Sequence, residues 1–579
     1  MKFFHVYNEE AFKGLEKNGL INKDSGFKIQ HAFSVPECRK FNNIAAISTK
    51  LHTLIKENKY PFYVDRIAGG ITYHKYDFDQ SLIEEYISVL GDWFLGFQLH
   101  ESASNRRNSD WQRILSLMDG SFGPYDAKKL RELSIRLFAK MPDGTVLAAF
   151  SQDTPEHYAT MTYAKTPNEY MEEIKDLFLR RMAEVKGRIL PCDSYYLATK
   201  IQNDMGMNSF MPEVGCQIPQ MRIEVALARG IAKMSGKTWG TYYECWRESR
   251  DGDLPFYSMP CYNSDTSNEW YLTQETHPDD FTTYGKNGGS SRLLQNRIYH
   301  YALMAGAHYF SEEWGLNCSY ADMTDYTLSE YGVVKKDFIN DALNFRNIKS
   351  KTPFAIVLPK SYSCIELQDM FEPCELGVHR SEYMRCILSD SEKEYYGHIE
   401  DVLKLIFAKN ETIGNEDHVI TNSRFPDVFD IIYEDAPKST FDSYNYLIDA
   451  TAGENFEKAN KSLWGKILKS DNLDELEKKL HKLIKEVMPC YVDSLCWLVS
   501  TDENGARYLS VFNNAGNERS LEKGDTICKS ANKQVNITFK ESTSIEVIKE
   551  SAGKINIERQ DDRTYSATIP AAGFAIIKF

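Results

Sequence analysis

The strongest constraint on the fold is an alternation of short apolar segments with amphipathic helical segments over roughly the first 350 residues, a pattern typical of a parallel sheet. The apolar segments predict eight strands, which are Phe3–Tyr7, Phe27–Phe33, Phe62–Ile67, Phe94–His100, Val146–Ser151, Ser209–Met211, Trp239–Tyr243 and Ala307–Ser311. Eight strand–helix units close a (β/α)8 barrel. The sequence therefore predicts an α/β fold with a TIM barrel over residues 1–349.

The pattern changes after residue 349, and a chain of 579 residues is too long for one core. Three further apolar strands with helices between them predict a small open α/β domain over residues 350–490; these are Phe354–Pro359, Val428–Tyr433 and Tyr446–Ile448. Residues 491–579 contain short alternating strands separated by turns such as Asn504-Gly505. They predict an all-β sandwich.

Composition and charge exclude several classes of protein. A net charge of −15 argues against a general nucleic-acid binder, which needs basic surface. No apolar run approaches the ~20 residues of a membrane span, and charges within the first ten residues argue against a signal peptide. The 12 cysteines include no CxxC pair and neither they nor the 13 histidines have zinc-site spacing. We expect a cytoplasmic protein whose thiols are reduced and which needs no metal or organic cofactor.

Two glutamates each follow an apolar strand directly. Glu101 comes after Phe94–His100, and Glu244 comes after Trp239–Tyr243. The carboxyl ends of parallel barrel strands lie at the mouth, where such enzymes keep their chemistry. Two carboxylates on different strands are the minimum needed to cleave a glycosidic bond. The alternatives are that Glu101 only braces the barrel by pairing with a basic residue such as Arg66, and that Glu244 is a surface-loop residue.

Further candidates lie at or near other strand ends. Glu312 and Glu313 are adjacent, and neighbouring side chains on a strand point to opposite sides, so at most one faces the barrel axis. That one is either a ligand for substrate hydroxyls or a rival nucleophile. Aromatic side chains near the glutamates suit stacking on a sugar ring. We favour Trp314 as an aromatic platform and one of Glu312 and Glu313 as a contact for a substrate hydroxyl, whereas Arg66 and Gln152 are each as well explained by a structural role. The residues assigned to substrate binding are Arg66, His100, Gln152, Glu213, Tyr243, Trp246, Glu312, Glu313 and Trp314.

With these residues in view, the chain resembles the clan A glycoside hydrolases, which are retaining enzymes on TIM barrels. Their acid/base glutamate ends strand four and their nucleophile ends strand seven, the positions of Glu101 and Glu244 here. The three-part layout is similar to that of the family 42 β-galactosidases and their relatives, in which an amidotransferase-like α/β domain and a small β-sandwich follow the barrel. Strand four of that family typically ends Asn-Glu, whereas this chain has His100-Glu101.

The resemblance implies that Glu101 is the acid/base and Glu244 the nucleophile of a retaining hydrolase. It does not give the sugar, since a galactosidase, a mannosidase or another exo-acting β-glycosidase is equally compatible. It implies carbohydrate as the partner and a trimer or dimer as the assembly. Two alternatives stay open. One is a carbohydrate-binding protein that has lost catalysis, and the other is an inverting hydrolase that uses Glu101 with Glu312 or Glu313. The carboxyl groups would lie ~5–5.5 Å apart in a retaining enzyme and ~6.5–9.5 Å apart in an inverting one.

Overall fold

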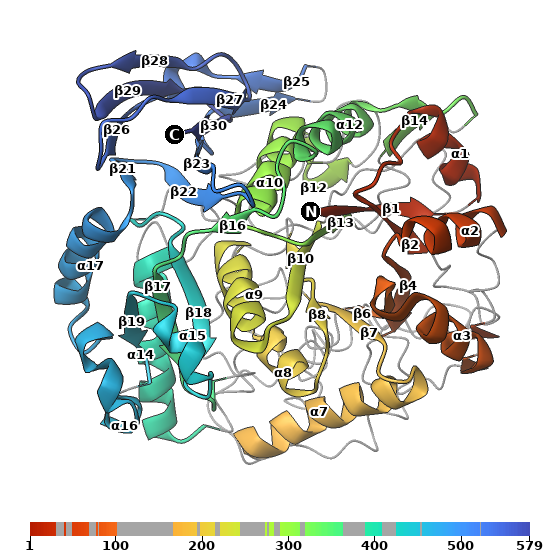
Figure 1. Ribbon diagram of the computed structural model, residues 1–579, viewed down its shortest axis with the longest axis horizontal. Helices are drawn as coiled ribbons and strands as arrows, with labels where there is room; N and C mark the ends of the chain where they lie inside the picture. The colour runs from red at the N-terminus through yellow and green to blue at the C-terminus, as the bar shows by residue number, and fades with distance from the viewer. Residues whose placement is uncertain are drawn as a thin grey trace.

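The computed structural model in Figure 1 describes residues 1–7, 9–29, 40–41, 49–68, 77–78, 80–100, 166–193, 197–214, 221–243, 272–274, 277–282, 290–312, 319–322, 324–362, 388–407, 424–451, 454–520 and 523–579.

The N-terminal part forms a parallel barrel. Its strands are β1 (Lys2–Tyr7), β2 (Ser25–Ile29), β4 (Phe62–Ala68), β6 (Phe94–His100), β7 (Ile189–Cys192), β8 (Ser209–Phe210), β9 (Glu213–Val214), β10 (Thr238–Tyr243) and β13 (Tyr309–Glu312). The order is β7-β6-β4-β2-β1-β13-β10-β8, and β9 also pairs with β10, so β8 and β9 share one position. The two ends of this order meet where the backbone N–H of Glu213 donates to the carbonyl of Asp193 at 3.1 Å. The prediction of an eight-stranded parallel barrel is confirmed.

One barrel strand differs from the prediction. The fifth position is occupied by β7, which pairs with β6 in parallel, with His100 opposite Cys192. The segment Val146–Ser151, predicted for this position, lies outside the described residues. The four-residue β7 contains Pro191, a residue that counts against a strand interior in a sequence pattern, which explains why it was missed.

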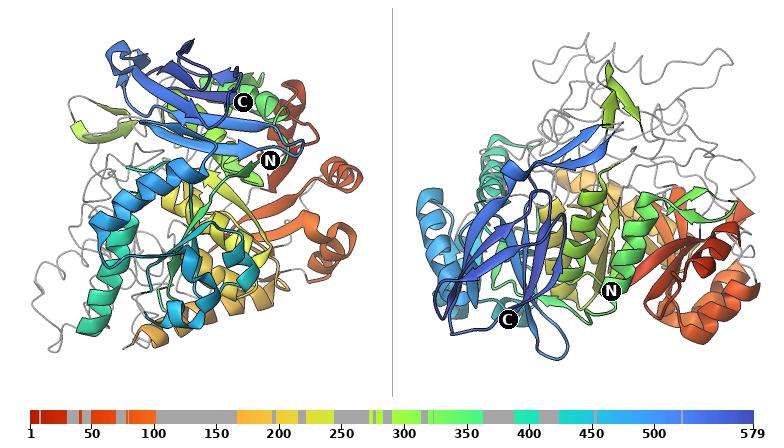
Figure 2. Two further views of the ribbon diagram at one scale, coloured as in Figure 1. Left: turned by 60° about the vertical axis from the view of Figure 1, so that its left-hand side comes forward. Right: turned by 90° about the horizontal axis from the view of Figure 1, so that it is seen from above.

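Helices surround the barrel, as Figures 1 and 2 show. They are α1 (Glu9–Lys17), α2 (Thr49–Asn58), α3 (Gln80–Leu90), α7 (Pro167–Glu184), α8 (Ala198–Asp204), α9 (Met221–Ser235), α10 (Arg292–Met304) and α12 (Glu330–Ala342). Several begin at a side chain that accepts a backbone N–H, such as Ser329, whose Oγ lies 3.0 Å from the nitrogen of Gly332. Three small strand pairs accompany them: β3 (Lys40–Phe41) with β5 (Asp77–Phe78), β11 (Leu272–Gln274) with β12 (His277–Thr282), and β14 (Tyr320–Asp322) with β15 (Thr327–Leu328).

Successive residues of the barrel strands enter two different cores, because side chains alternate across a strand. The inward-facing residues form a small cluster inside the barrel, made of Phe4, Tyr63, Leu190, Cys192, Met211 and Tyr242. The residues between them pack outward against the helices, as Phe3, Phe62 and Phe97 do. Both faces of the strands are therefore buried, and the interior cluster forms the floor beneath the barrel mouth.

A second, four-stranded sheet is parallel throughout. Its order is β18 (Phe429–Tyr433), β17 (Phe354–Leu358), β19 (Tyr446–Asp449) and β20 (Ile467–Lys469). The helices α14 (Asp390–Phe407), α15 (Lys438–Asp442), α16 (Glu454–Ala459) and α17 (Leu473–Val487) accompany it. Of these strands, the short β20 was not predicted.

Two antiparallel sheets make up the C-terminal part. The first has the order β16 (Lys349–Ser350), β22 (Cys496–Thr501), β23 (Arg507–Phe512), β30 (Phe574–Lys578) and β27 (Glu546–Glu550). The second has the order β21 (Cys490–Val492), β26 (Lys533–Phe539), β29 (Thr564–Ile569) and β28 (Asn556–Arg559), and a hairpin joins β24 (Asn517–Ser520) to β25 (Gly524–Ile527). In β26 every second residue from Val535 is buried and the others are exposed, so the second sheet has one core face and one solvent face.

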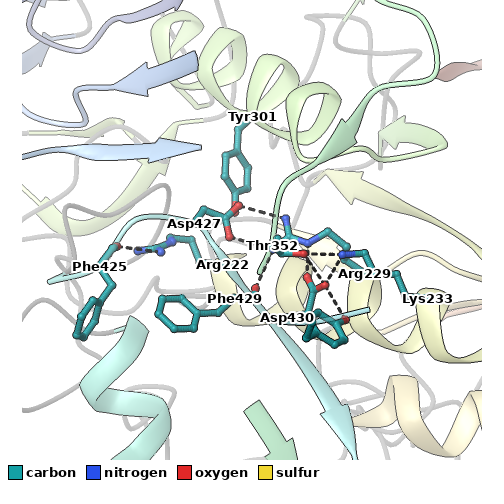
Figure 3. A network of polar contacts seen from close by, with 10 residues as sticks. Arg222, Arg229, Lys233, Tyr301, Thr352, Phe425, Asp427, Phe429 and Asp430 are labelled. Carbon is teal, nitrogen blue, oxygen red and sulfur yellow. Dashed lines mark hydrogen bonds and ion pairs between the residues drawn. The ribbon is translucent and has the colours of Figure 1, made fainter. Parts of the chain in front are cut away.

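A buried ionic network joins the barrel to the second sheet (Figure 3). Arg229 on α9 donates from Nε to Asp430 at 2.5 Å and from Nη2 to Asp427 at 3.0 Å. Lys233, one turn along α9, lies 2.5 Å from the other oxygen of Asp430. Burial alone would raise the pKa of Asp430, but Lys233 and Arg229 outweigh it and lower that pKa, so the carboxylate stays charged. The pairing satisfies charges that would otherwise be costly to bury.

No helix among the described residues combines the length and the apolar character that a membrane crossing requires.

Candidate active site

The fourth and seventh barrel strands end next to the two predicted catalytic glutamates. In order around the barrel, β6 is the fourth strand and β10 the seventh. β6 ends at His100 and β10 ends at Tyr243. Glu101 and Glu244 are the next residues of the chain, and both lie outside the described residues. So do Gln152, Trp246, Glu313 and Trp314, and for Arg66 in β4 and His100 in β6 the structure describes the backbone alone.

A buried lysine lies inside the barrel near its mouth. Lys28, on the second strand, is 2% exposed. Its ammonium donates to the backbone carbonyl of Glu312 at 2.7 Å and to the hydroxyl of Tyr242 at 3.4 Å, and it stands 5.1 Å from the centre of the Tyr242 ring. Burial of an ammonium requires such donors and acceptors around it, and the aromatic face adds attraction. The Lys28 side chain therefore places a basic group inside the barrel, beside the ends of the seventh and eighth strands.

Hydroxyl groups cross the barrel beside this lysine. Tyr63 on the third strand and Ser311 on the eighth strand share a hydrogen bond of 2.7 Å between Oη and Oγ. Both side chains are fully buried. This contact fixes the two strands at the same height and places oxygen donors and acceptors in the floor of the mouth.

Glu213 faces the same interior. Its backbone is opposite Tyr242 in the β9–β10 register, and residues paired in a parallel ladder point to the same side of the sheet. Glu213 is fully buried. It is thus the one residue predicted for substrate binding whose side chain the structure describes within the barrel.

Gln98 is an unsatisfied amide in the same layer. It is aligned with inward-facing Leu190, it is fully buried, and neither its amide oxygen nor its amide nitrogen has a hydrogen-bond partner in the described part of the chain. Buried amides in native proteins nearly always pair with protein, water or ligand. Gln98 therefore places an amide, with an acceptor oxygen and a donor nitrogen, in the buried layer inside the barrel.

Tyr243 does not face the barrel interior, contrary to the expectation that it binds substrate. Tyr242 and Tyr243 are consecutive on β10, so they point to opposite sides, and Tyr242 is the inward one. The Tyr243 hydroxyl lies 2.7 Å from Ser290 Oγ and 2.8 Å from the hydroxyl of Tyr331, within the layer of helices. Its role in this fold is to anchor the end of β10.

Glu312 also faces the helices, so the expected roles in substrate contact or catalysis do not fit its position. Its carboxylate accepts a hydrogen bond from Tyr299 on α10 and forms an ion pair with Lys335 on α12. Burial, and secondly Glu312 itself, raise the pKa of the Tyr299 hydroxyl well above its usual value, so this hydroxyl stays protonated and donates. Glu312 braces strand eight against two helices.

The sequence analysis missed five of the polar or aromatic residues that the structure brings together inside the barrel, namely Lys28, Tyr63, Gln98, Tyr242 and Ser311. A usable signal was present for two of them. Alternate residues share one face of a strand, so Gln98 lies on the same face as His100, which was a candidate. Tyr242 lies on the opposite face from Tyr243 and on the same face as residue 244 would if the strand continued. For the remaining three, nothing in a strand buried on both sides separates inward from outward positions.

Among the described residues, no group of three or more His, Cys, Asp or Glu side chains is arranged to hold a metal ion.

Comparisons with known proteins give only distant similarities. No family model and no curated protein matches the chain. Among solved structures, the chain is similar to α-L-fucosidase isoenzyme 2 from Paenibacillus thiaminolyticus, with 8% identity, a TM-score of 0.42 and coverage of 100% of this chain and 98% of that one. It is also similar to a polyextremophilic β-galactosidase from Halorubrum lacusprofundi, with 9% identity, a TM-score of 0.34 and coverage of 100% and 99%. Both TM-scores are too low to indicate a shared fold or activity.

Proposed function

We propose that this protein is a retaining glycoside hydrolase with Glu244 as nucleophile and Glu101 as acid/base. One observation carries the proposal: β6 and β10 are the fourth and seventh strands of an eight-stranded parallel barrel, and each is followed immediately by a glutamate in the sequence. The mouth of such a barrel is where catalytic side chains gather. The numbering of β6 as the fourth strand and β10 as the seventh does not depend on the predicted strand Val146–Ser151, because β7 fills the fifth position.

In the proposed mechanism, the Glu244 carboxylate attacks the anomeric carbon while Glu101 donates a proton to the departing glycosidic oxygen. The C–O bond to the leaving group breaks as the bond to Glu244 forms, which gives a covalent glycosyl–enzyme. Glu101, now a carboxylate, removes a proton from water, and the resulting hydroxide equivalent displaces Glu244 from the sugar. Two inversions give net retention of configuration.

The inward-facing polar layer supports a sugar as the substrate. Lys28, Gln98 and Glu213 supply a cationic donor, an amide and a carboxylate beneath the mouth, and sugar hydroxyls need donors and acceptors of this kind. We retain the proposed contacts from Arg66, His100, Gln152, Trp246, Glu313 and Trp314, and we omit Tyr243 and Glu312 because both face the helices. The proposed substrates are β-linked galactosides or mannosides cleaved from a chain end.

The finer domain division belongs to the same proposal. We assign residues 1–349 to the catalytic barrel, 350–490 to an amidotransferase-like α/β domain and 491–579 to a β-sandwich, with a dimer or trimer as the assembly. The parallel order β18-β17-β19-β20 and the two C-terminal antiparallel sheets support this division.

Glycosidase assays on the purified chain test the proposal. A panel of aryl α- and β-glycosides identifies the sugar, and NMR of the first-formed product distinguishes retention from inversion. We expect Glu244→Ala to lower kcat by roughly 10^4-fold or more, because no residue replaces the nucleophile. Glu101→Ala should lower kcat/KM by roughly 10^2–10^4-fold on alkyl glycosides and far less on dinitrophenyl glycosides, whose phenolate departs without a proton. It should lower kcat on both, because hydrolysis of the glycosyl–enzyme also needs Glu101 as the base.

Glu172→Gln is the matched control, since Glu172 lies exposed on α7 and forms a local i,i+3 ion pair with Lys175. It should leave the rates unchanged. Inverted product with an active Glu244→Ala variant would favour the inverting alternative through Glu101 and Glu313. Sugar binding without turnover in the wild-type protein would favour the carbohydrate-binding alternative.

A further inference from the structure

Three buried hydroxyls hold the end of the seventh barrel strand. Tyr243 is the last residue of β10, and its hydroxyl contacts Ser290 Oγ at 2.7 Å and the Tyr331 hydroxyl at 2.8 Å. Ser290 and Tyr331 also hydrogen-bond to each other, which closes a triangle. All three side chains are fully buried. The triangle thus ties β10 to the residues at the start of α10 and of α12.

Arg292 links this triangle to the first turn of α10. Its guanidinium donates to the backbone carbonyl of Ser290 and stacks over the ring of Tyr331, with 4.3 Å between the guanidinium carbon and the ring centre. The position of Arg292 therefore bears on two of the three members of the triangle. A displacement of the first turn of α10 would be felt at Tyr243.

A carboxylate from the C-terminal part fixes that first turn. Oδ2 of Asp525, in the β24–β25 hairpin, accepts from the backbone nitrogens of Arg292 at 2.8 Å and Leu293 at 3.3 Å, and from Ser291 Oγ at 3.0 Å. Asn517 of the same hairpin donates to Ser291 Oγ at 2.8 Å. Figure 1 shows this hairpin beside α10. A negative charge that accepts from the free N–H groups of a helix start is a stabilising arrangement.

The rest of α10 packs on the same C-terminal part. Arg297 donates to the side chain of Asn514 at 3.1 Å, and His300 packs on Phe574 with 4.6 Å between ring centres. The helix thus contacts the C-terminal part at several positions, while the residues at its start are linked to Tyr243 of β10 through Ser290. This gives a continuous physical path from the hairpin to the residue that precedes Glu244.

We infer that Asp525 is a positioning residue for the mouth of the barrel: through the first turn of α10 and the Tyr243–Ser290–Tyr331 triangle, the β24–β25 hairpin holds the end of β10 in place. The inference rests on the proposed function in so far as residue 244 is the nucleophile. The C-terminal part is then a component of the active site's support, and its removal impairs turnover without removing a substrate contact.

Hydrogen–deuterium exchange measured by mass spectrometry tests the path without any assumption about activity. Asp525→Ala should raise the exchange rate of amides in peptides that contain the end of β10 by about 10-fold or more, since freeing the first turn of α10 loosens the triangle. Asn472→Ala is the matched control, because Asn472 caps α17 by accepting from Glu475 N at 3.1 Å and has no contact with α10 in the described structure. It should leave β10 unchanged. Faster exchange confined to the first turn of α10 in Asp525→Ala would overturn the inference.

Turnover of an aryl glycoside gives the second readout. Asp525→Ala and Tyr331→Phe should each lower kcat about 10-fold with KM within about twofold of wild type, because a misplaced nucleophile slows chemistry more than binding. Asp525→Asn, which keeps the acceptor oxygen, should recover most of the loss. Unchanged kcat in both Asp525→Ala and Tyr331→Phe contradicts the inference. A wild-type protein that cleaves no glycoside refutes the proposed function alone, and the exchange experiment still decides the path.

Discussion

At the scale of single residues, burial rather than contact with substrate sets the chemistry of several ionisable groups. His5 on β1 is the clearest case. Burial, and secondly the charge of Lys335, lower the pKa of His5 from 6.5 to about 3. The ring packs near Phe3 and Phe27, and its Nε2 lies 3.4 Å from Ser25 Oγ. His5 is therefore neutral in the folded protein over the whole physiological range.

This lowered pKa predicts a loss of stability in mild acid. Below pH 6.5 the unfolded chain binds a proton at residue 5 that the folded chain does not, so the free energy of unfolding falls as pH decreases. At pH 5 the protonation of His5 in the unfolded chain lowers the free energy of unfolding by about 2 kcal/mol. Urea unfolding at pH 7 and pH 5 should show a smaller pH-dependent loss in His5→Gln than in the wild-type protein. Equal losses in the two proteins would contradict the assignment.

The same scale shows which site residues a sequence can give. Glu312 and Glu313 were expected to include at most one inward-facing carboxylate, and only the contacts of Glu312 with Tyr299 and Lys335 show that Glu312 faces outward. Tyr243 was chosen because it adjoins Glu244, whereas alternation favours Tyr242 as the inward-facing aromatic. Proximity in sequence is a poor guide to proximity in a strand, where nearest neighbours face opposite ways.

At the scale of elements, close backbone contact between α9 and β18 explains one glycine. A Cβ atom added at Gly230 on α9 would lie 2.0 Å from the carbonyl oxygen of Ile431 on β18. The helix and the strand can approach this closely only because residue 230 has no side chain. The approach brings Arg229 within reach of Asp427 and Asp430.

Gly230→Ala should therefore destabilise the fold, although alanine is the better helix former. We expect a loss of about 1–3 kcal/mol or more in the free energy of unfolding, because the helix must move away from the strand. Gly465→Ala is a suitable comparison, since no described atom lies within 4 Å of a Cβ there. Its effect should be smaller. Equal urea midpoints for the two variants would show that the contact is not limiting.

Element prediction from the sequence succeeded where apolar runs were long and failed where they were short. Strands such as β4, β6 and β10 are six or seven residues long, are rich in apolar and aromatic residues, and fall where predicted. β7 is four residues with a proline, and β9 is two residues that include Glu213, so neither carries a readable period. The number of barrel strands was right, but the fifth was assigned to the wrong segment because register and pairing are long-range properties.

At the scale of the whole molecule, the barrel and the second sheet depend on one another through Arg229. Removal of this guanidinium takes away a positive charge that compensates both Asp427 and Asp430, which are fully buried. Arg229→Met should lower the free energy of unfolding by about 3–5 kcal/mol. Arg424→Met, which removes an exposed partner of Glu477 at 3.3 Å, should cost less than about 1 kcal/mol. Equal costs in chemical unfolding would mean that Arg229 gives no special support to the junction.

The network also has a defined pH range. The pKa of Asp430 is lowered in the folded protein, so its contribution is complete above the unfolded value near 3.8 and is lost as pH falls through the lowered value. The junction is thus insensitive to mild acid, unlike the His5 position. Stability measured between pH 7 and pH 5 reports on histidines whose pKa burial lowers, such as His5, His300 and His308, and not on Asp430.

The pairing of β16 with β22 has a practical meaning for anyone who dissects the chain. Lys349 lies opposite Thr501 and Ser350 lies opposite Ser500. The segment that follows the barrel is therefore also the edge strand of a sheet whose other strands begin about 150 residues later in the chain. A fragment that starts at residue 491 would lack β16 and leave one edge of β22 unpaired. Unpaired strand edges promote self-association. A soluble truncation has to carry residues 349–351 with it, or supply a substitute strand in trans.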